Sequence, residues 1–237
     1  MGVGALVTLW EALLFVALPY ASITLFVAGH IWRYRHDKFG WTSRSTQLLE
    51  RRWLAWGSNL FHYGALAAIG GHVVGLLIPE QLTHAVGISE GAYHLFAAAA
   101  GTVAGLACVA GFVILVGRRA YFPRIRRTTT WTDVMVYLVL AGIIVLGLIE
   151  TIGFNTLGSG YNYRPTIGVW FRSLLWLHPE PQLIAGAPLV YQLHATLPWI
   201  LYAVWPFSRL VHAWSLPWQY VGRPNILYRR RYGLARR

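Results

Sequence analysis

The chain has little cysteine and little charge, and each shortage excludes a class of protein. Its 237 residues include one cysteine, Cys108. A single cysteine excludes an internal disulfide, a cysteine-rich iron–sulfur cluster and the Cys-x-x-Cys-His attachment of a c-type haem. Charged residues make up 12% of the chain and hydrophobic residues 56%, whereas soluble domains are about 25% charged. The composition therefore predicts an integral membrane protein without a sizeable soluble domain.

Five segments are long and apolar enough to cross a bilayer, because about 20 helical residues span a hydrocarbon core of ~30 Å. No basic residue lies in Met1–Trp10, so we expect this stretch to begin the first span rather than to form a signal peptide. We expect an all-α membrane protein in which residues 1–237 form one domain, with a basic tail at residues 216–237. The five expected spans are residues 3–29, 53–78, 92–116, 132–154 and 188–215.

Lysine and arginine are distributed unevenly between the two ends of these spans. Eighteen of the 20 lie in the first loop, in the third loop, or in and near the tail, and only Arg164 and Arg172 lie on the other side. Cytoplasmic loops of membrane proteins are enriched in basic residues. We therefore expect the N-terminus outside and the C-terminus in the cytoplasm. The same pattern explains the net charge of +12 without nucleic-acid binding.

Four histidines lie within two of the expected spans. His62 and His72 lie on the second span, and His194 and His212 on the fifth. If these helices run antiparallel, His62 faces His212 near the cytoplasm and His72 faces His194 near the outside. Two imidazoles fill both axial positions of a haem iron, an arrangement that suits electron transfer. The nested pairs therefore predict two haem sites at two membrane depths.

The spacing of the four histidines is unequal. Ten residues along a helix rise ~15 Å and eighteen rise ~27 Å, so tilted helices or inclined haem planes are needed. Eighteen residues are five full turns, so we expect His194 and His212 to share one helix face. A lone membrane histidine is more often a polar packing residue, but four at matched depths favour haem ligation, since intramembrane ionisable groups are costly. The other five histidines lie in loops or at span ends and are expected to be interfacial.

Five short motifs of the chain are SNLFH (Ser58–His62), Gly71-His72, PFSRLVHAWS (Pro206–Ser215), QLLER (Gln47–Arg51) and Thr128–Thr130. Together they resemble the gamma subunit of respiratory nitrate reductase, and the similarity runs over nearly the whole chain. The resemblance implies a five-helix cytochrome b with two b haems, multi-pass in the prokaryotic inner (cytoplasmic) membrane. It implies that His62 and His212 hold the inner haem iron and that His72 and His194 hold the outer one, the pairing that the topology also gives.

The resemblance also implies an activity and partners. The chain would oxidise quinol near the outer face and pass electrons to an iron–sulfur subunit, and a cytoplasmic molybdenum catalytic subunit would reduce nitrate. In this family a lysine near the start of the third span is linked with the quinol site, but the only lysine here is Lys38, on the other side. We hypothesise that Glu90 or His94 replaces it, or that Glu150 assists, in taking protons from quinol. The simpler alternative is that each is an interfacial residue at a helix end.

Arg209 is a candidate partner for a haem propionate, because it lies three residues before His212 and propionates are anionic. The positive-inside pattern alone would also explain this arginine. The basic cytoplasmic face suits docking of an iron–sulfur subunit or attraction to anionic lipid.

Three alternative functions stay open. The first is a cytochrome b subunit of a related quinol-linked complex with another terminal acceptor, which only the partner subunits would distinguish. The second is a small transporter or proton channel, which predicts inverted repeats and broken helices that the sequence does not reveal. The third is a passive anchor, which needs no histidine pairs.

Overall fold

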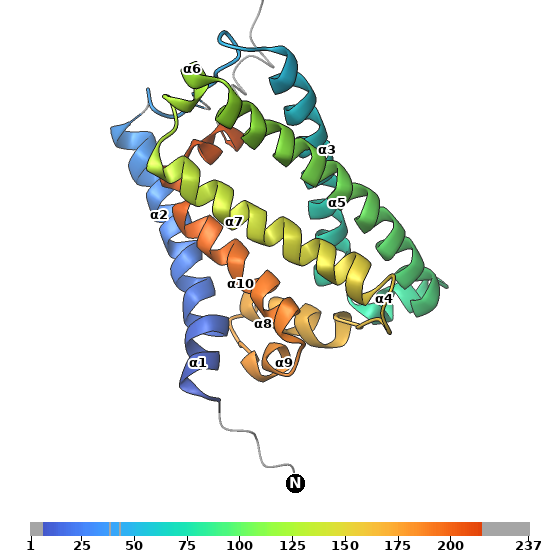
Figure 1. Cartoon of the computed structure of the whole chain (residues 1–237). Helices are drawn as coiled ribbons and strands as arrows, with labels where there is room; N and C mark the ends of the chain where they lie inside the picture. The colour runs from blue at the N-terminus through green and yellow to red at the C-terminus, as the bar shows by residue number, and fades with distance from the viewer. Residues whose placement is uncertain (1–6, 38, 43, 215–237) are drawn as a thin grey trace, which may run out of the picture.

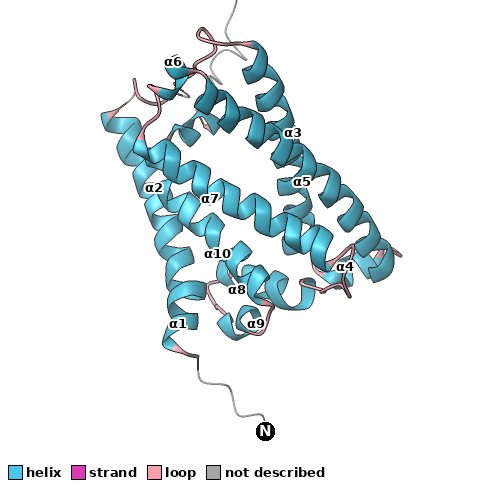
Figure 2. Ribbon diagram, in the orientation of Figure 1, coloured by secondary structure: helices cyan, strands magenta, loops and turns pink. Residues whose placement is uncertain are grey.

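The structure is a computed structural model that describes residues 7–37, 39–42 and 44–214. Helices and their connections make up the described part, with no strand in it (Figure 2). Four continuous helices in it are long and apolar enough to cross a membrane, which confirms an all-α membrane protein. They are α1, η1 and α2 (Leu9–Ala12, Leu13–Ala17, Leu18–His36), α3 and η2 (Arg52–His72, Val73–Leu77), α5 (Glu90–Tyr121), and α7 and η3 (Trp131–Leu148, Ile149–Phe154).

Polar caps explain where several of these helices begin. Thr8 and Glu11 form a capping box at the start of α1, and Thr130 and Asp133 form another at α7. The Ser89 side chain accepts a hydrogen bond from the Ala92 amide at the start of α5. Each cap satisfies amides that have no partner inside the helix.

The first and third helices end later than the hydropathy predicts. The first helix runs to His36 instead of residue 29, and α5 runs to Tyr121 instead of residue 116. Basic residues occupy the last turns of both helices, where positive charge complements the helix dipole. Hydropathy detects the apolar part of a helix and misses such polar extensions.

The segment expected as a fifth continuous helix is broken. The helix α10 covers Leu189–Val204, and two short 3₁₀ turns follow, η5 (Trp205–Phe207) and η6 (Arg209–Ala213). Pro206 has no amide hydrogen to continue the helix, and Ser208 is extended, with φ −112° and ψ −180°. The expectation that His194 and His212 share one face of a straight helix is therefore wrong. The 16 residues of α10 rise only ~24 Å.

The long helices form two groups that lie side by side (Figure 1). The helix α3 packs chiefly along α5, whereas α10 packs against α2 and α7. Glycines allow the close approach of the first pair, because a Cβ atom added at Gly64 would lie 2.6 Å from the Cys108 amide nitrogen. Small residues at helix contacts are typical of membrane helix pairs.

The connection between α7 and α10 forms a small packed layer at one end of the molecule. It contains η4 (Arg164–Gly168), α8 (Val169–Leu175) and α9 (Pro181–Ala185), near α4 (Glu80–Ala85), while α6 (Pro123–Arg126) lies at the opposite end (Figure 1). Trp170 is only 1% exposed, and its indole donates a hydrogen bond to the Phe15 carbonyl. One side of α8 is therefore buried in protein, with Ser173 and Leu174 buried beside Trp170.

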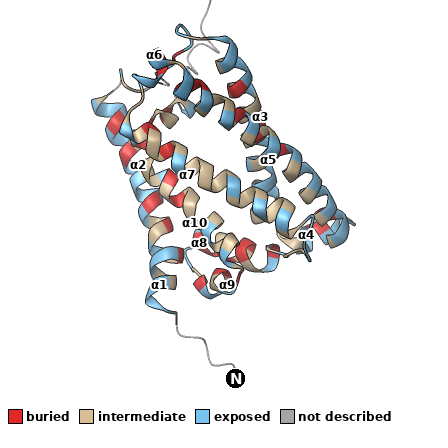
Figure 3. Ribbon diagram, in the orientation of Figure 1, coloured by how far each residue is buried: buried red, intermediate tan, exposed pale blue. Residues whose placement is uncertain are grey.

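Much of the outer surface of the long helices is exposed and apolar (Figure 3). Leu66, Val103 and Leu138, each near the middle of a candidate span, are between 63% and 71% exposed. Apolar side chains that point outward at mid-span are what a lipid-facing surface needs.

Candidate functional site

The structure brings together the two histidine pairs that the sequence predicts. The ring centroids of His62 and His212 are 5.9 Å apart, and those of His72 and His194 are 5.8 Å apart. His62 and His72 lie on α3, His194 on α10 and His212 on η6. The helix break after Val204 allows this, because His212 leaves the line of α10 before it meets His62.

Backbone hydrogen bonds determine which ring nitrogen three of these histidines present. Nδ1 donates to the Ser58 carbonyl from His62, to the Ala68 carbonyl from His72 and to the Arg209 carbonyl from His212, each at 2.7 Å. Since a carbonyl only accepts, Nδ1 carries the proton and Nε2 keeps its lone pair. This is the tautomer that binds metal ions through Nε2.

His194 differs from the other three. Its Nδ1 is buried and lacks a partner that meets hydrogen-bond geometry, although the Ile143 carbonyl lies close to the ring. A Cβ atom added at Gly147 would lie 3.0 Å from Cε1 of this ring. His194 is therefore held mainly by packing against α7.

The pairs leave suitable room for a metal between the rings. Two imidazoles that bind one metal from opposite sides, at ~2 Å each, have centroids roughly 6 Å apart. Both measured separations agree with that value. A Cβ atom added at Gly70 or Gly71 would meet no atom within 4 Å, and the His72 side chain is itself exposed. The residues therefore fit two haems with bis-histidine ligation.

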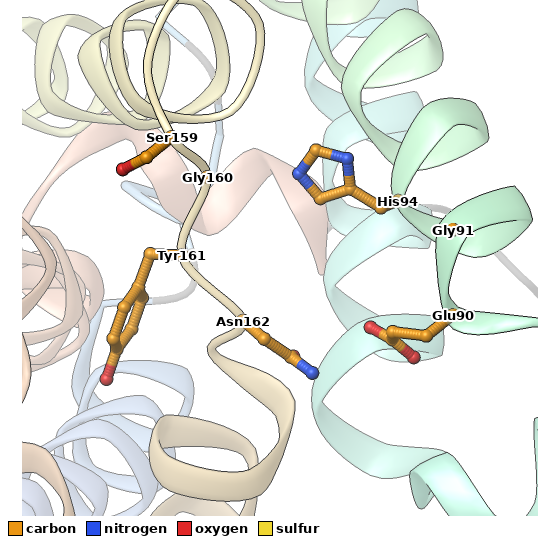
Figure 4. Close-up of a pocket in the computed structure, with 7 residues that line it drawn as sticks. All are labelled: Glu90, Gly91, His94, Ser159, Gly160, Tyr161 and Asn162. Atoms are coloured by element: carbon orange, nitrogen blue, oxygen red, sulfur yellow. The ribbon is translucent and has the colours of Figure 1, made fainter.

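A cavity of about 340 Å³ lies at the same end as the packed layer (Figure 4). Glu90 and His94 contribute to it from α5, and the segment from Ser159 to Asn162 lines the other side. The His94 ring points toward that segment, whereas Tyr161 points away from α5. Gly160 has a φ of +78°, which suits glycine, and an added Cβ there would lie 3.4 Å from His94 Nε2.

The three candidate proton acceptors are thus not all together. Glu90 and His94 line the cavity, and His94 Nε2 is 3.3 Å from Asn155 Oδ1. Glu150 is not among the lining residues and lies on η3. One of its carboxyl oxygens is buried without a hydrogen bond.

The sequence analysis missed the residue that holds Glu90. Arg164 is 1% exposed and donates to Glu90 Oε2 and to Thr83 Oγ1, both at 3.0 Å. Its guanidinium also lies 4.0 Å from the centre of the Tyr93 ring. Burial, with the hydrogen bond to Tyr93 adding to it, raises the pKa of neighbouring Tyr163 well above its usual value. The sequence did set Arg164 apart, because it is one of only two basic residues on the side with few basic residues.

A cluster of three ionisable side chains lies at this cavity. Ligand atoms of Glu80, His84 and Glu90 lie within 4.8 Å of one another. Glu80 pairs with His84 at 3.5 Å, and Arg164 pairs with Glu90. The carboxylates already have these partners, so we assign no metal site to them.

Arg209 contacts a carboxylate of the protein itself. Its Nε and Nη2 atoms donate to the two carboxylate oxygens of Asp133, each at 2.6 Å. Asp133 is 2% exposed. A role for Arg209 at a haem propionate stays a prediction. Sequence reasoning missed Asp133, although an acidic residue at the start of an apolar span was visible.

The fold and the site define a helical membrane protein with two pairs of neighbouring histidine rings. The family described as nitrate reductase gamma subunit matches residues 11–231 of the chain. The chain therefore belongs to the nitrate reductase gamma subunit family, and the resemblance noted from its motifs is confirmed.

Relatives of this chain carry matching names. It is 44% identical over 214 residues to the nitrate reductase gamma chain of Bacillus subtilis, covering 90% of this chain and 96% of that protein. It is 34% identical over 215 residues to the respiratory nitrate reductase 1 gamma chain of Escherichia coli, covering 90% and 95%. It is 48% identical over 224 residues to the nitrate reductase-like protein NarX of Mycobacterium tuberculosis, covering 94% of this chain but 34% of that protein. The chain thus spans about a third of the length of NarX.

Proposed function

We propose that this chain is the membrane cytochrome b subunit of a respiratory nitrate reductase in a prokaryotic inner membrane. Its family and the names of its gamma-chain relatives support nitrate as the terminal acceptor of the complex. The protein crosses the membrane five times, with α10 and the turns after it as the fifth span. The N-terminus is outside and the C-terminus is in the cytoplasm, as the distribution of basic residues indicates.

The observation that carries this proposal is the pair of histidine–histidine contacts, with ring centroids 5.9 Å and 5.8 Å apart. His62 and His212 bind the inner haem, and His72 and His194 bind the outer one. When bound, two b haems supply reversible one-electron carriers at two membrane depths. The protein fixes three imidazoles through their Nδ1 hydrogen bonds, so their Nε2 atoms are available to iron.

The cavity beside α5 is the candidate quinol site. Its volume of about 340 Å³ is in the range of small-molecule pockets, which starts near ~300 Å³. Oxidation of a quinol releases two protons, and Glu90 and His94 lie one helical turn apart to accept them. Arg164 and Asn155 hold these two side chains in place. Glu150, which lies on η3 outside the cavity, would serve as a separate proton acceptor.

The electrons leave toward an iron–sulfur subunit, and a molybdenum subunit carries the nitrate-reducing centre. The single cysteine of this chain supports the view that the iron–sulfur clusters lie in a partner. The basic residues of the cytoplasmic side provide the docking surface.

Haem content per polypeptide tests the proposal. The purified chain is expected to contain two b haems, visible in dithionite-reduced difference spectra. Replacing His72 or His194 by alanine is expected to remove one haem and leave the other. A well-folded preparation without haem would contradict the proposal and favour a transporter or an anchor.

The quinol site has its own test in the assembled complex. Glu90→Gln and His94→Gln are expected to lower quinol-dependent nitrate reduction, because each removes a proton acceptor from the cavity. Glu180→Gln is a matched control, since Glu180 lies in the packed layer at the same end, just before α9, but does not line the cavity. Turnover equal to that of the unchanged protein would remove the tested residue from the site.

A further inference from the structure

The turn before His212 is held from one side by α2. Arg33 is 5% exposed, and its Nη1 atom donates to the carbonyls of Pro206 at 2.6 Å and Ser208 at 2.9 Å. Its Nη2 atom donates to the Gly40 carbonyl at 2.6 Å. Arg33 therefore fixes the point at which the chain leaves α10 and enters η6.

The segment that carries His212 is also held by α7. The Asp133 carboxylate receives the two hydrogen bonds from Arg209 and one from the Thr130 amide at 2.9 Å. Arg119 Nη1 lies 3.9 Å from the same carboxylate. Asp133 is thus fixed in the first turn of α7 by its capping box and is surrounded by cationic groups.

Arg209 connects this buried carboxylate to the candidate haem ligand. Its side chain binds Asp133, and its backbone carbonyl accepts the hydrogen bond from His212 Nδ1 at 2.7 Å. His212 is the one member of the four that lies on a 3₁₀ turn, which spans five residues. Short 3₁₀ turns have poor hydrogen-bond geometry and little stability of their own. The orientation of His212 therefore depends on contacts from outside its own segment.

We propose that Asp133 is a positioning residue for His212, acting through Arg209, and that it tunes the inner haem selectively. The inference rests on the proposed function, since it requires haem between His62 and His212. His62 and His72 need no such support, because their Nδ1 atoms donate to carbonyls within the regular helix α3. His194 packs against Gly147 and is not part of the Asp133 network.

The test is Asp133→Asn in the full-length, haem-loaded chain. The amide keeps the shape of the carboxylate but removes its charge and one acceptor oxygen, while Arg209 and Arg119 stay cationic. The inner-haem midpoint potential is expected to rise, because a more positive environment favours ferrous iron. The low-spin electron paramagnetic resonance signal of the inner haem is expected to shift as His212 reorients. Asp133→Glu is expected to restore the potential toward the original value.

Two further variants keep the result interpretable. Arg209→Lys retains the charge but loses the two-pronged contact, so it is expected to alter the resonance signal more than the potential. Glu50→Gln is the matched control, because it removes another largely buried carboxylate–arginine pair, with Arg118, that does not contact the His212 segment. It is expected to leave both haems unchanged. The signal that is lost in the His72→Ala variant identifies the outer haem.

Two results would overturn the inference while the proposed function stands. One is an unchanged inner-haem potential and signal in Asp133→Asn. The other is an equal shift of both haems, which would indicate general loosening of the fold. A chain that binds no haem before any substitution would contradict the proposed function and this inference with it.

Discussion

At the residue scale, two candidate site residues, His194 and Glu90, depend on neighbours that no sequence motif marks. Gly147 leaves room for the His194 ring, and Arg164 holds Glu90 at the edge of the cavity. The roles of Gly147 and Arg164 come from residues that are distant in the sequence and near in the fold, so no local motif reveals them.

Gly147→Ala is expected to disturb the outer haem. The added Cβ would lie 3.0 Å from Cε1 of His194, which is closer than ordinary van der Waals contact, so the ring must move. We expect a shifted outer-haem absorption or resonance signal and an unchanged inner one. Gly117→Ala is the control, since a Cβ there meets no atom within 4 Å and should stabilise the helix by up to about 1 kcal/mol. An unaltered outer haem in Gly147→Ala would contradict this role of the glycine.

Arg164→Met is expected to destabilise the end of the molecule that holds the cavity. Breaking a buried ion pair costs about 3–5 kcal/mol, and because the Glu90 side chain is 31% exposed, solvent screening reduces this to about 1–3 kcal/mol. The measurement is the apparent unfolding temperature, with Glu90→Gln added to complete a double-mutant cycle. Arg126→Met, at an exposed position, should change stability by less than about 0.5 kcal/mol. Additive effects of the Arg164 and Glu90 substitutions would show that the pair is not coupled.

At the scale of elements, ion pairs fasten loops and short turns to the long helices. Arg118 on α5 donates to Glu50 Oε2 at 2.5 Å and to Thr46 Oγ1 at 2.9 Å. These bonds attach the loop before α3 to the neighbouring helix. Hydrogen bonds from Arg33 to the Pro206 and Ser208 carbonyls, together with the Asp133–Arg209 ion pair, hold η5 and η6 in place.

The Glu50 contact is expected to make stability depend on pH. Burial raises the pKa of Glu50, but hydrogen bonds from Arg118 and from the Trp53 and Leu54 amides outweigh it, so its pKa lies below the usual value of 4.5. A lowered pKa in the folded state gives stabilisation that is present above the usual carboxyl pKa and is lost as the pH falls through the folded value. The gap in unfolding temperature between the original chain and Glu50→Gln should therefore be constant from about pH 7 to about pH 5 and shrink toward about pH 3. A gap that does not depend on pH would contradict this account.

At the scale of the whole molecule, the number of membrane crossings determines where the termini lie. Four helices qualify by length and hydropathy in the described residues, and α10 with the turns after it is the proposed fifth span. An odd number of spans places the two termini on opposite sides, and an even number places them on the same side.

Reporter fusions separate these two topologies. A fluorescent protein fused after Arg237 is expected to be bright, since it folds in the cytoplasm, and a phosphatase fused there is expected to be inactive. An N-terminal phosphatase with its own export signal should be active. The reason is that eighteen basic residues lie on the side of the C-terminus and two on the other side. Loops rich in basic residues stay in the cytoplasm when a protein inserts into the membrane. Both termini on one side would instead indicate that α10 does not cross.

Properties that depend on local sequence could be predicted from the sequence. The membrane class and the positions of four spans follow from runs of apolar residues, and the partners of His62 and His72 follow from antiparallel helices. Hydropathy and charge are properties of each residue, so their pattern can be read directly from the sequence. Glu90 and His94 could also be placed together, since they lie one turn apart on the same helix.

Only the tertiary structure reveals the features that depend on distant residues. The helix after Val204 breaks and is held by Arg33 and Asp133, which lie more than 70 residues away. Arg164 is buried because Glu90 and Thr83 surround it, while the sequence shows it only as a loop arginine. A buried charge is stable only with partners, and partners from other helices are found only when the chain has folded.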